Sequence, residues 1–117
     1  MDRIVINGVK TFFLEKEKLF YSIGRSADCE ISIPDETNHL SRWHATLSRD
    51  LFGEFWLISD GNSAKPSTAG ITINGQRLPP NRAQRLRDND IVVLTPAVYF
   101  VYYRGDEGAK DEDATYY

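Results

Sequence analysis

The sequence has little that would support an extracellular, membrane-embedded or metal-dependent role. Its 117 residues include a single cysteine, Cys29, so no internal disulfide can form. No group of residues with metal-ligand spacing surrounds this cysteine. No apolar run approaches the ~20 residues of a membrane helix, and the first residues lack the apolar stretch of a signal peptide. We therefore predict a soluble, intracellular (cytoplasmic) protein that needs no metal or cofactor, with Cys29 as a small, half-buried thiol.

The sequence also lacks an overall basic character. The net charge is −3 and the pI is about 5.3, which argues against nucleic-acid binding because that function needs clustered lysine and arginine. The charge is uneven, since residues 82–87 include three arginines whereas residues 106–113 are mostly acidic. An anionic average of this kind still permits one cationic pocket for a phosphate group.

A long helical period is missing as well, and short apolar and β-branched segments alternate with turn signals instead. Asn7-Gly8 and Asn74-Gly75 are the strongest hairpin signals, because both residue types tolerate the positive φ of tight turns. The pattern predicts an all-β sandwich. The candidate strands are Ile4–Val9, Thr11–Leu14, Leu19–Ile23, Glu30–Ile33, Ala45–Ser48, Glu54–Ser59, Ile71–Ile73, Gln84–Leu86, Ile91–Leu94 and Val98–Tyr103.

The chain divides into one compact domain and a short terminal segment. Residues 1–104 contain all the candidate strands and are expected to fold as a single unit. Residues 105–117 are acidic and poor in aliphatic side chains, which predicts a disordered tail or the start of a linker to a further C-terminal region. Within the domain, the polar segments Asp35–His44 and Asp60–Gly70 are the loops in which we expect binding residues.

Three residues have the chemistry to hold a phosphate group. Arg25 follows a glycine at the end of a candidate strand, and a guanidinium can give phosphate two parallel charge-assisted hydrogen bonds. Ser41 adds a hydroxyl donor and Arg42 a second charge, which suits the three acceptor oxygens of a phosphomonoester. Taken singly, each residue has an ordinary alternative role as a solvated arginine or a turn serine.

His44 is better explained as a structural residue than as a catalytic one. It follows Ser41 by three positions, but no acidic partner completes a triad, and no nucleophile, base and oxyanion site can be assembled. We predict a neutral imidazole that bonds loop backbone and holds Ser41 and Arg42 in place. His39 is interpreted as an ordinary loop residue. Trp43 is interpreted as a packing residue, with a ligand platform as the open alternative, and the protein as a non-enzyme.

Together these segments resemble forkhead-associated (FHA) domains, in family order across about residues 4–103. Four blocks carry the resemblance: the glycine-arginine segment Gly24–Asp35, the serine-arginine-x-histidine block Ser41–Ala45, the asparagine-glycine hairpin Ile73–Gly75 followed by Leu78, and Arg87–Ile91. In the last block Asn89 stands where the family usually has glycine.

The resemblance implies an antiparallel β-sandwich of about eleven short strands that holds phosphothreonine-containing partners with loops at one end. Carried over position by position, Arg25 and Ser41 would bind the phosphate directly, and Arg42 would assist the phosphate or the peptide backbone. The residues implied to shape the site are Gly24, His44, Asn74 and Gly75. The implied function is phosphopeptide recognition in signalling, in a domain fused to further C-terminal sequence.

The loop at residues 60–70 departs from the family. Ala69-Gly70-Ile71 stands where asparagine-glycine-threonine is expected, and the loop is several residues longer. Asn62, Ser67 or Thr68 could replace the missing asparagine, and the sequence does not choose among them. The departure keeps a second function open, an interaction or scaffold domain of the same fold whose phosphate pocket is weak or unused.

Overall fold

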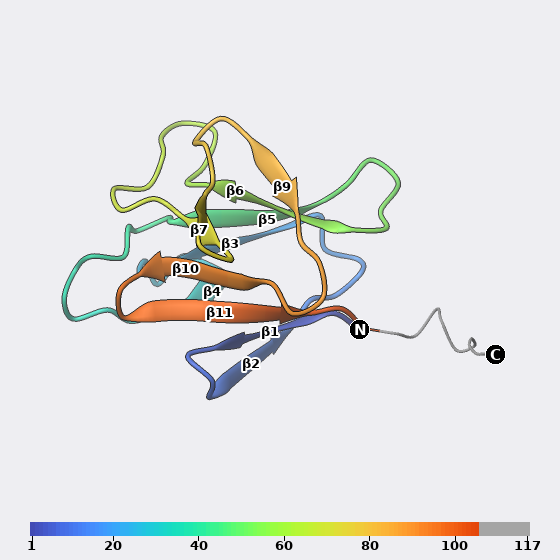
Figure 1. The fold of residues 1–117 in the computed structure, drawn as a ribbon, viewed down its shortest axis with the longest axis horizontal. Helices are drawn as coiled ribbons and strands as arrows, with labels where there is room; N and C mark the ends of the chain where they lie inside the picture. The colour runs from blue at the N-terminus through green and yellow to red at the C-terminus, as the bar shows by residue number, and fades with distance from the viewer. Residues whose placement is uncertain (106–117) are drawn as a thin grey trace.

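The computed structural model describes residues 1–105, and the predicted acidic tail lies almost entirely outside this range. The described chain forms eleven strands in two packed sheets (Figure 1). No helix in it is long and apolar enough to cross a membrane. The strands are β1 (Arg3–Ile6), β2 (Lys10–Phe13), β3 (Phe20–Gly24), β4 (Ile31–Ser32), β5 (Ala45–Arg49), β6 (Trp56–Asp60), β7 (Thr72–Ile73), β8 (Gln76–Arg77), β9 (Ala83–Arg85), β10 (Ile91–Thr95) and β11 (Val98–Tyr103).

One sheet has six strands in the order β2-β1-β11-β10-β7-β8, and the other has five in the order β4-β3-β5-β6-β9. The predicted all-β sandwich is confirmed. One pair differs from the antiparallel expectation, because β3 and β4 run parallel, with Ile23 beside Ile31. The connection between them, residues 25–30, contains a turn closed by the hydrogen bond from Cys29 N to Ser26 O (3.1 Å).

Strand β8 is the element that the sequence pattern did not predict. It consists of Gln76 and Arg77, which are both exposed, so it has no apolar alternation to reveal it. It forms because Asn74-Gly75 turns the chain back onto β7 with φ values of 51° and 86°. The positive φ of the other hairpin, Asn7-Gly8, is equally present at 51° and 73°. Both hairpin predictions are confirmed.

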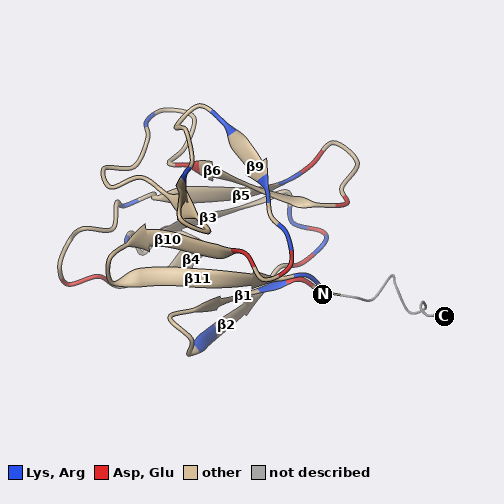
Figure 2. Ribbon diagram, viewed as in Figure 1, with Lys and Arg blue, Asp and Glu red and all other residues tan. Residues whose placement is uncertain are grey.

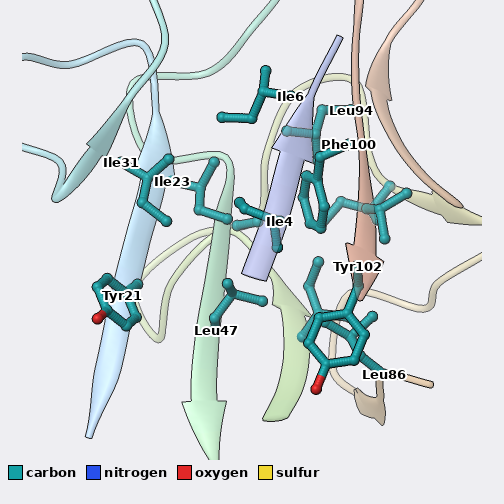
Figure 3. Packing of buried hydrophobic residues seen from close by; sticks show 14 of the residues in the cluster. Ile4, Ile6, Tyr21, Ile23, Ile31, Leu47, Leu86, Leu94, Phe100 and Tyr102 are labelled. Atoms are coloured by element: carbon teal, nitrogen blue, oxygen red, sulfur yellow. The ribbon is translucent and has the colours of Figure 1, made fainter. Parts of the chain in front are cut away.

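The core lies between the two sheets and is built from alternate residues of each strand. In β6, Trp56 and Ile58 are buried whereas Leu57, which faces outward, is only half-buried. Figure 3 shows Ile4 and Phe100 of one sheet packed near Ile23 and Leu47 of the other. Trp56 is 1% exposed and its ring centroid lies 5.6 Å from that of Tyr21, so Trp56 is a packing residue. This shared core fixes the strand ends from which the loops extend.

The β7–β8 turn and the β9–β10 turn are tied together by side-chain hydrogen bonds. Asn74 donates from Nδ2 to the buried Asp90 carboxylate (2.8 Å) and accepts from Ile91 N (2.9 Å). Asp90 also accepts from Arg87 N (2.8 Å). Asn89 has a φ of 72°, which explains why asparagine can replace the usual glycine, since it is among the few other residues that tolerate this conformation.

Candidate functional site

A cavity of about 500 Å³ is bordered by several loops. Figure 1 shows that these loops lie at the end of the sandwich away from the N-terminus. The cavity is lined by Arg25, Asn38, His39, Leu40, Ser41, Arg42, Trp43, Asn62, Lys65, Pro66, Thr68, Ala69 and Pro96. Three lining side chains are cationic and none is acidic. Figure 2 shows lysine and arginine positions on the loops here, with the acidic stretch farther out on the 33–44 loop. None of these three cations forms an ion pair with another described residue.

The β3 end is held against the loop that carries Ser41 by backbone hydrogen bonds. Arg25 N donates to Ser41 O (3.0 Å) and Ser26 N donates to Arg42 O (3.1 Å). The two segments approach so closely at Gly24 that a Cβ there would lie 2.1 Å from Arg42 O. Glycine is therefore required at this position for contact between backbones, and its φ is not in the left-handed region.

We expect Gly24→Ala to impair folding and the cavity together. The added methyl group would push back the backbone of residues 41–42, and forcing an extra group into a packed site costs about 1–3 kcal/mol, occasionally more. Urea unfolding should show the loss of stability. Gly75→Ala is a comparison for backbone strain alone, because its φ is 86° while no atom lies within 4 Å of the Cβ position, so it should cost stability without disturbing the cavity. An unchanged midpoint of urea unfolding for Gly24→Ala would show that the close backbone approach does not require glycine at this position.

The side chain of Arg25 is anchored at one end only. Its Nε donates to Leu40 O (2.9 Å), and the Asp35 carboxylate accepts from Leu40 N (2.7 Å) to fix the same residue. Hydrogen bonds from Thr37 and from Leu40 N lower the pKa of Asp35, which keeps that carboxylate ionised. Within residues 1–105 the two terminal amino groups of Arg25 have no partner, so they remain available to an anion in the cavity.

Ser41 is poised to donate a hydrogen bond. Its Oγ accepts from Thr68 N (2.9 Å), and among the described residues its hydroxyl proton has no acceptor. Arg42 beside it is exposed and lines the same cavity. The structure therefore brings together the three residues that the sequence proposed for phosphate.

His44 is fully buried and links three segments. Its Nδ1 accepts from Ser41 N (3.0 Å), and its Nε2 lies 2.8 Å from Gly70 O. Its backbone N donates to Ile23 O (2.7 Å). Since Nδ1 accepts, the proton of the neutral ring belongs on Nε2, where it is donated to the Gly70 carbonyl. The imidazole thus spans the Ser41 loop and the 60–70 loop without facing the cavity.

Burial lowers the pKa of His44, opposed by the Gly70 carbonyl and the nearby Asp60 carboxylate. The unfolded chain therefore takes up a proton near the ordinary histidine pKa of about 6.5, before the folded protein does. We expect the free energy of unfolding to be highest above that pH and to fall as the pH drops below it. The loss is at most about 1.4 kcal/mol per pH unit for one proton.

Urea unfolding at pH 7.5 and pH 5.5 would measure this loss. His44→Gln should remove it, whereas His39→Gln, which deletes the exposed histidine of the neighbouring loop, should keep the parent's loss. A parent loss that persists unchanged in His44→Gln would assign the acid sensitivity to another group.

The long 60–70 loop separates its three candidate residues. Ser67 does not line the cavity, because its hydroxyl bonds the Asp60 carboxylate and its Oγ accepts from Gly70 N (2.9 Å). Asn62 and Thr68 do line it. Asn62 Oδ1 is taken by Ala64 N (2.8 Å) and Lys65 N (2.9 Å), which leaves its amide hydrogens for a ligand. Residues 61–66 thus form a loop whose two flanking residues, Asp60 and Ser67, are joined by a hydrogen bond.

The position or burial of several residues differs from what the sequence predicted. Asn74 and Gly75 lie on the β7–β8 turn and do not line the cavity. Cys29 is 8% exposed, so it is buried and not half-buried, and its Sγ donates to Arg42 O (3.1 Å). Lys65 was not singled out from the sequence, and being the sole cation of the 60–70 loop was the available signal.

The cavity shows no arrangement typical of metal-dependent chemistry. Within residues 1–105, no group of three or more His, Cys, Asp and Glu side chains is placed to hold a metal ion. The polar groups that converge on the cavity are guanidinium, ammonium and hydroxyl donors, which together suit an anion with several acceptor oxygens.

Several solved protein structures are similar to this chain in fold. The Slr1951 protein from Synechocystis is 26% identical and superposes with a TM-score of 0.75, with 90% of this chain and 99% of that one covered. The N-terminal FHA domain of S. cerevisiae Rad53p, solved with a phosphothreonine peptide, is 21% identical over 90% of this chain and 94% of that one, with a TM-score of 0.73. The FhaA FHA domain, solved with the intracellular domain of Rv3910, is 24% identical over 87% and 99%, with a TM-score of 0.70.

Sequence comparison gives the family. No curated protein sequence matches the chain significantly. Residues 21–95, more than half of the 117-residue chain, match the family described as FHA domain, and this range spans the cavity-lining residues from Arg25 to Ala69. The chain therefore belongs to the FHA domain family.

Proposed function

We propose that this domain binds phosphothreonine-containing proteins through the cavity between Arg25 and Ser41. FHA domains are a family of phosphothreonine-binding modules and not catalysts. The observation that carries the proposal is the convergence on one cavity of three cations and a hydroxyl proton that have no ionic or acceptor partner within residues 1–105, in a lining without an acidic residue. The proposal also implies a signalling role inside the cell.

The phosphate would be held from three sides. Arg25 offers two terminal amino groups, Ser41 offers its hydroxyl proton, and Arg42 or Lys65 adds charge from the rim. Because Thr68 N already occupies a lone pair of Ser41 Oγ, the hydroxyl is oriented before the ligand arrives. A site that is oriented in advance loses less entropy on binding.

A pair of matched peptide libraries tests the proposal. Calorimetric titration with a degenerate phosphothreonine library should give saturable binding, whereas the same library without phosphate should give none. Equal binding of both libraries, or of neither, would favour the scaffold function, to which the altered 60–70 loop points.

Selectivity between phosphothreonine and phosphoserine should be weak. Ala69 lines the cavity at the place of the family's asparagine and lacks the side-chain amide that would position the peptide backbone. Threonine preference depends on a snug site for one methyl group, worth about 1–3 kcal/mol at best. We therefore expect less than about a tenfold preference, measured with phosphothreonine and phosphoserine peptides of otherwise identical sequence.

Ala69→Asn supplies the missing amide at an exposed position and should raise the preference. A strong preference in the parent would show that Asn62 or Thr68, the two candidates that line the cavity, has taken over the role.

A further inference from the structure

Trp43 stands between the phosphate cavity and a second hollow. It lines the 500 Å³ cavity and also a hollow of about 520 Å³ on the outer face of the five-stranded sheet, and Asn62 lines both as well. Its indole is held in place, because Nε1 donates to Thr46 Oγ1 (2.9 Å), whose hydroxyl donates to Gly61 O (2.7 Å). Trp43 is therefore an oriented, half-buried wall shared by two adjoining sites.

The floor of the second hollow is formed by small outward-facing side chains. Thr46 of β5 pairs with Ser59 of β6, and Ser59 pairs with Ala83 of β9, so the three lie in one row across the sheet. Phe20 of β3 lines the same hollow and is 46% exposed. The row of small residues leaves open the space that the two aromatic rings border.

The hollow contains few polar groups that would need a hydrogen-bond partner from a ligand. Asp60 is 4% exposed, and its carboxylate accepts from Ser67 N (3.1 Å) and from the Ser67 hydroxyl. Arg82 supplies the one cationic side chain among the lining residues. An apolar side chain could enter between the rings without leaving a buried charge unpaired.

We propose that a bound phosphothreonine partner continues past Trp43 and places a bulky apolar side chain in the hollow between Trp43 and Phe20. The inference rests on the proposed function and adds to it a second contact site. Continuity of the two sites through Trp43 and Asn62 identifies the occupant as part of the phosphorylated partner. Trp43 and Phe20 are then residues that determine which phosphothreonine sequences bind.

A positional scan of phosphothreonine peptides tests this proposal. Each position within six residues of the phosphothreonine would carry alanine, leucine or phenylalanine in turn, with the rest degenerate. We expect one position at which leucine or phenylalanine raises affinity about tenfold over alanine, as one well-placed apolar side chain can.

Two variants locate that preference. Phe20→Ser should abolish it while the alanine-containing phosphopeptides still bind, because Phe20 lines the second hollow and not the phosphate cavity. Trp43→Ala should also abolish it, but it should weaken basal binding as well, because Trp43 lines both sites. Phe13→Ser is the matched control, since Phe13 is an exposed phenylalanine of the other sheet, 57% exposed, and its loss should leave the preference intact. Phe20→Ser is informative even where Trp43→Ala unfolds.

The outcomes separate the two proposals. A parent protein that binds phosphothreonine peptides with no apolar preference, or a preference that survives Phe20→Ser, overturns the second site alone. A parent protein that binds no phosphothreonine peptide overturns the proposed function and, with it, the second site.

Discussion

Arg25→Ala should lower phosphopeptide affinity by about 10- to 150-fold, the equivalent of one hydrogen bond to a charged group at about 1.5–3 kcal/mol. The side chain makes one hydrogen bond within the described residues, from Nε to Leu40 O, and its terminal amino groups are available to an anion in the cavity. Stability should fall by no more than about 1 kcal/mol, the worth of that one half-buried hydrogen bond. Calorimetric titration of the folded variant measures the effect.

Two further arginine variants separate charge from geometry. Arg25→Lys keeps the charge but loses the planar fork, so its affinity should lie between those of the parent and Arg25→Ala. Arg87→Ala removes an exposed arginine from the β9–β10 turn, which does not line the cavity, and should bind as the parent does. Unchanged affinity in a folded Arg25→Ala protein would contradict the assignment of the phosphate site.

His44→Ala should lower stability and affinity together. It removes the acceptor of Ser41 N and the donor to Gly70 O, and each buried group left without a partner costs about 1–3 kcal/mol. For a domain of this size the total corresponds to a fall in Tm of about 10 °C or more. Binding weakens as well, because the Ser41 loop and the 60–70 loop lose their shared support.

Ser41→Ala is the contrasting variant. It removes the hydroxyl that would donate a hydrogen bond to the phosphate, so affinity should fall. It also removes the acceptor of Thr68 N, but Thr68 is exposed to water, so Tm should stay near the parent value. His44→Asn restores an acceptor close to Ser41 N and should recover part of the Tm. A His44→Ala protein that melts like the parent would show that the imidazole does not support the loops.

The elements that could be predicted from the sequence are those with local signals. Asn7-Gly8 and Asn74-Gly75 require positive φ and have it, and the alternating burial of β6 follows its sequence pattern. Strand β8 lacked such a signal, since two exposed polar residues become a strand only when the hairpin folds them onto β7.

The arrangement of the site needed the structure. The sequence did not show which of Asn62, Ser67 and Thr68 lines the cavity. Ser67 is held away from it by its hydrogen bond to Asp60, and the sequence does not give the path of the loop between these two residues. The need for Gly24 was equally hidden, because it arises from the backbone of residues distant in sequence. Trp43 lines both the cavity and the second hollow, and this position likewise depends on how the loops meet the sheet.

The most direct test of the phosphate site is a backbone amide NMR titration with a phosphothreonine peptide and its unphosphorylated twin. We expect the phosphorylated peptide to shift the amides of Arg25, Ser41, Arg42 and Thr68 most strongly, because these four residues line the cavity. Amides at the opposite end, such as that of Gly53 in the β5–β6 turn, should stay in place. Equal shifts with the unphosphorylated peptide, or shifts centred away from Arg25 and Ser41, would contradict this expectation.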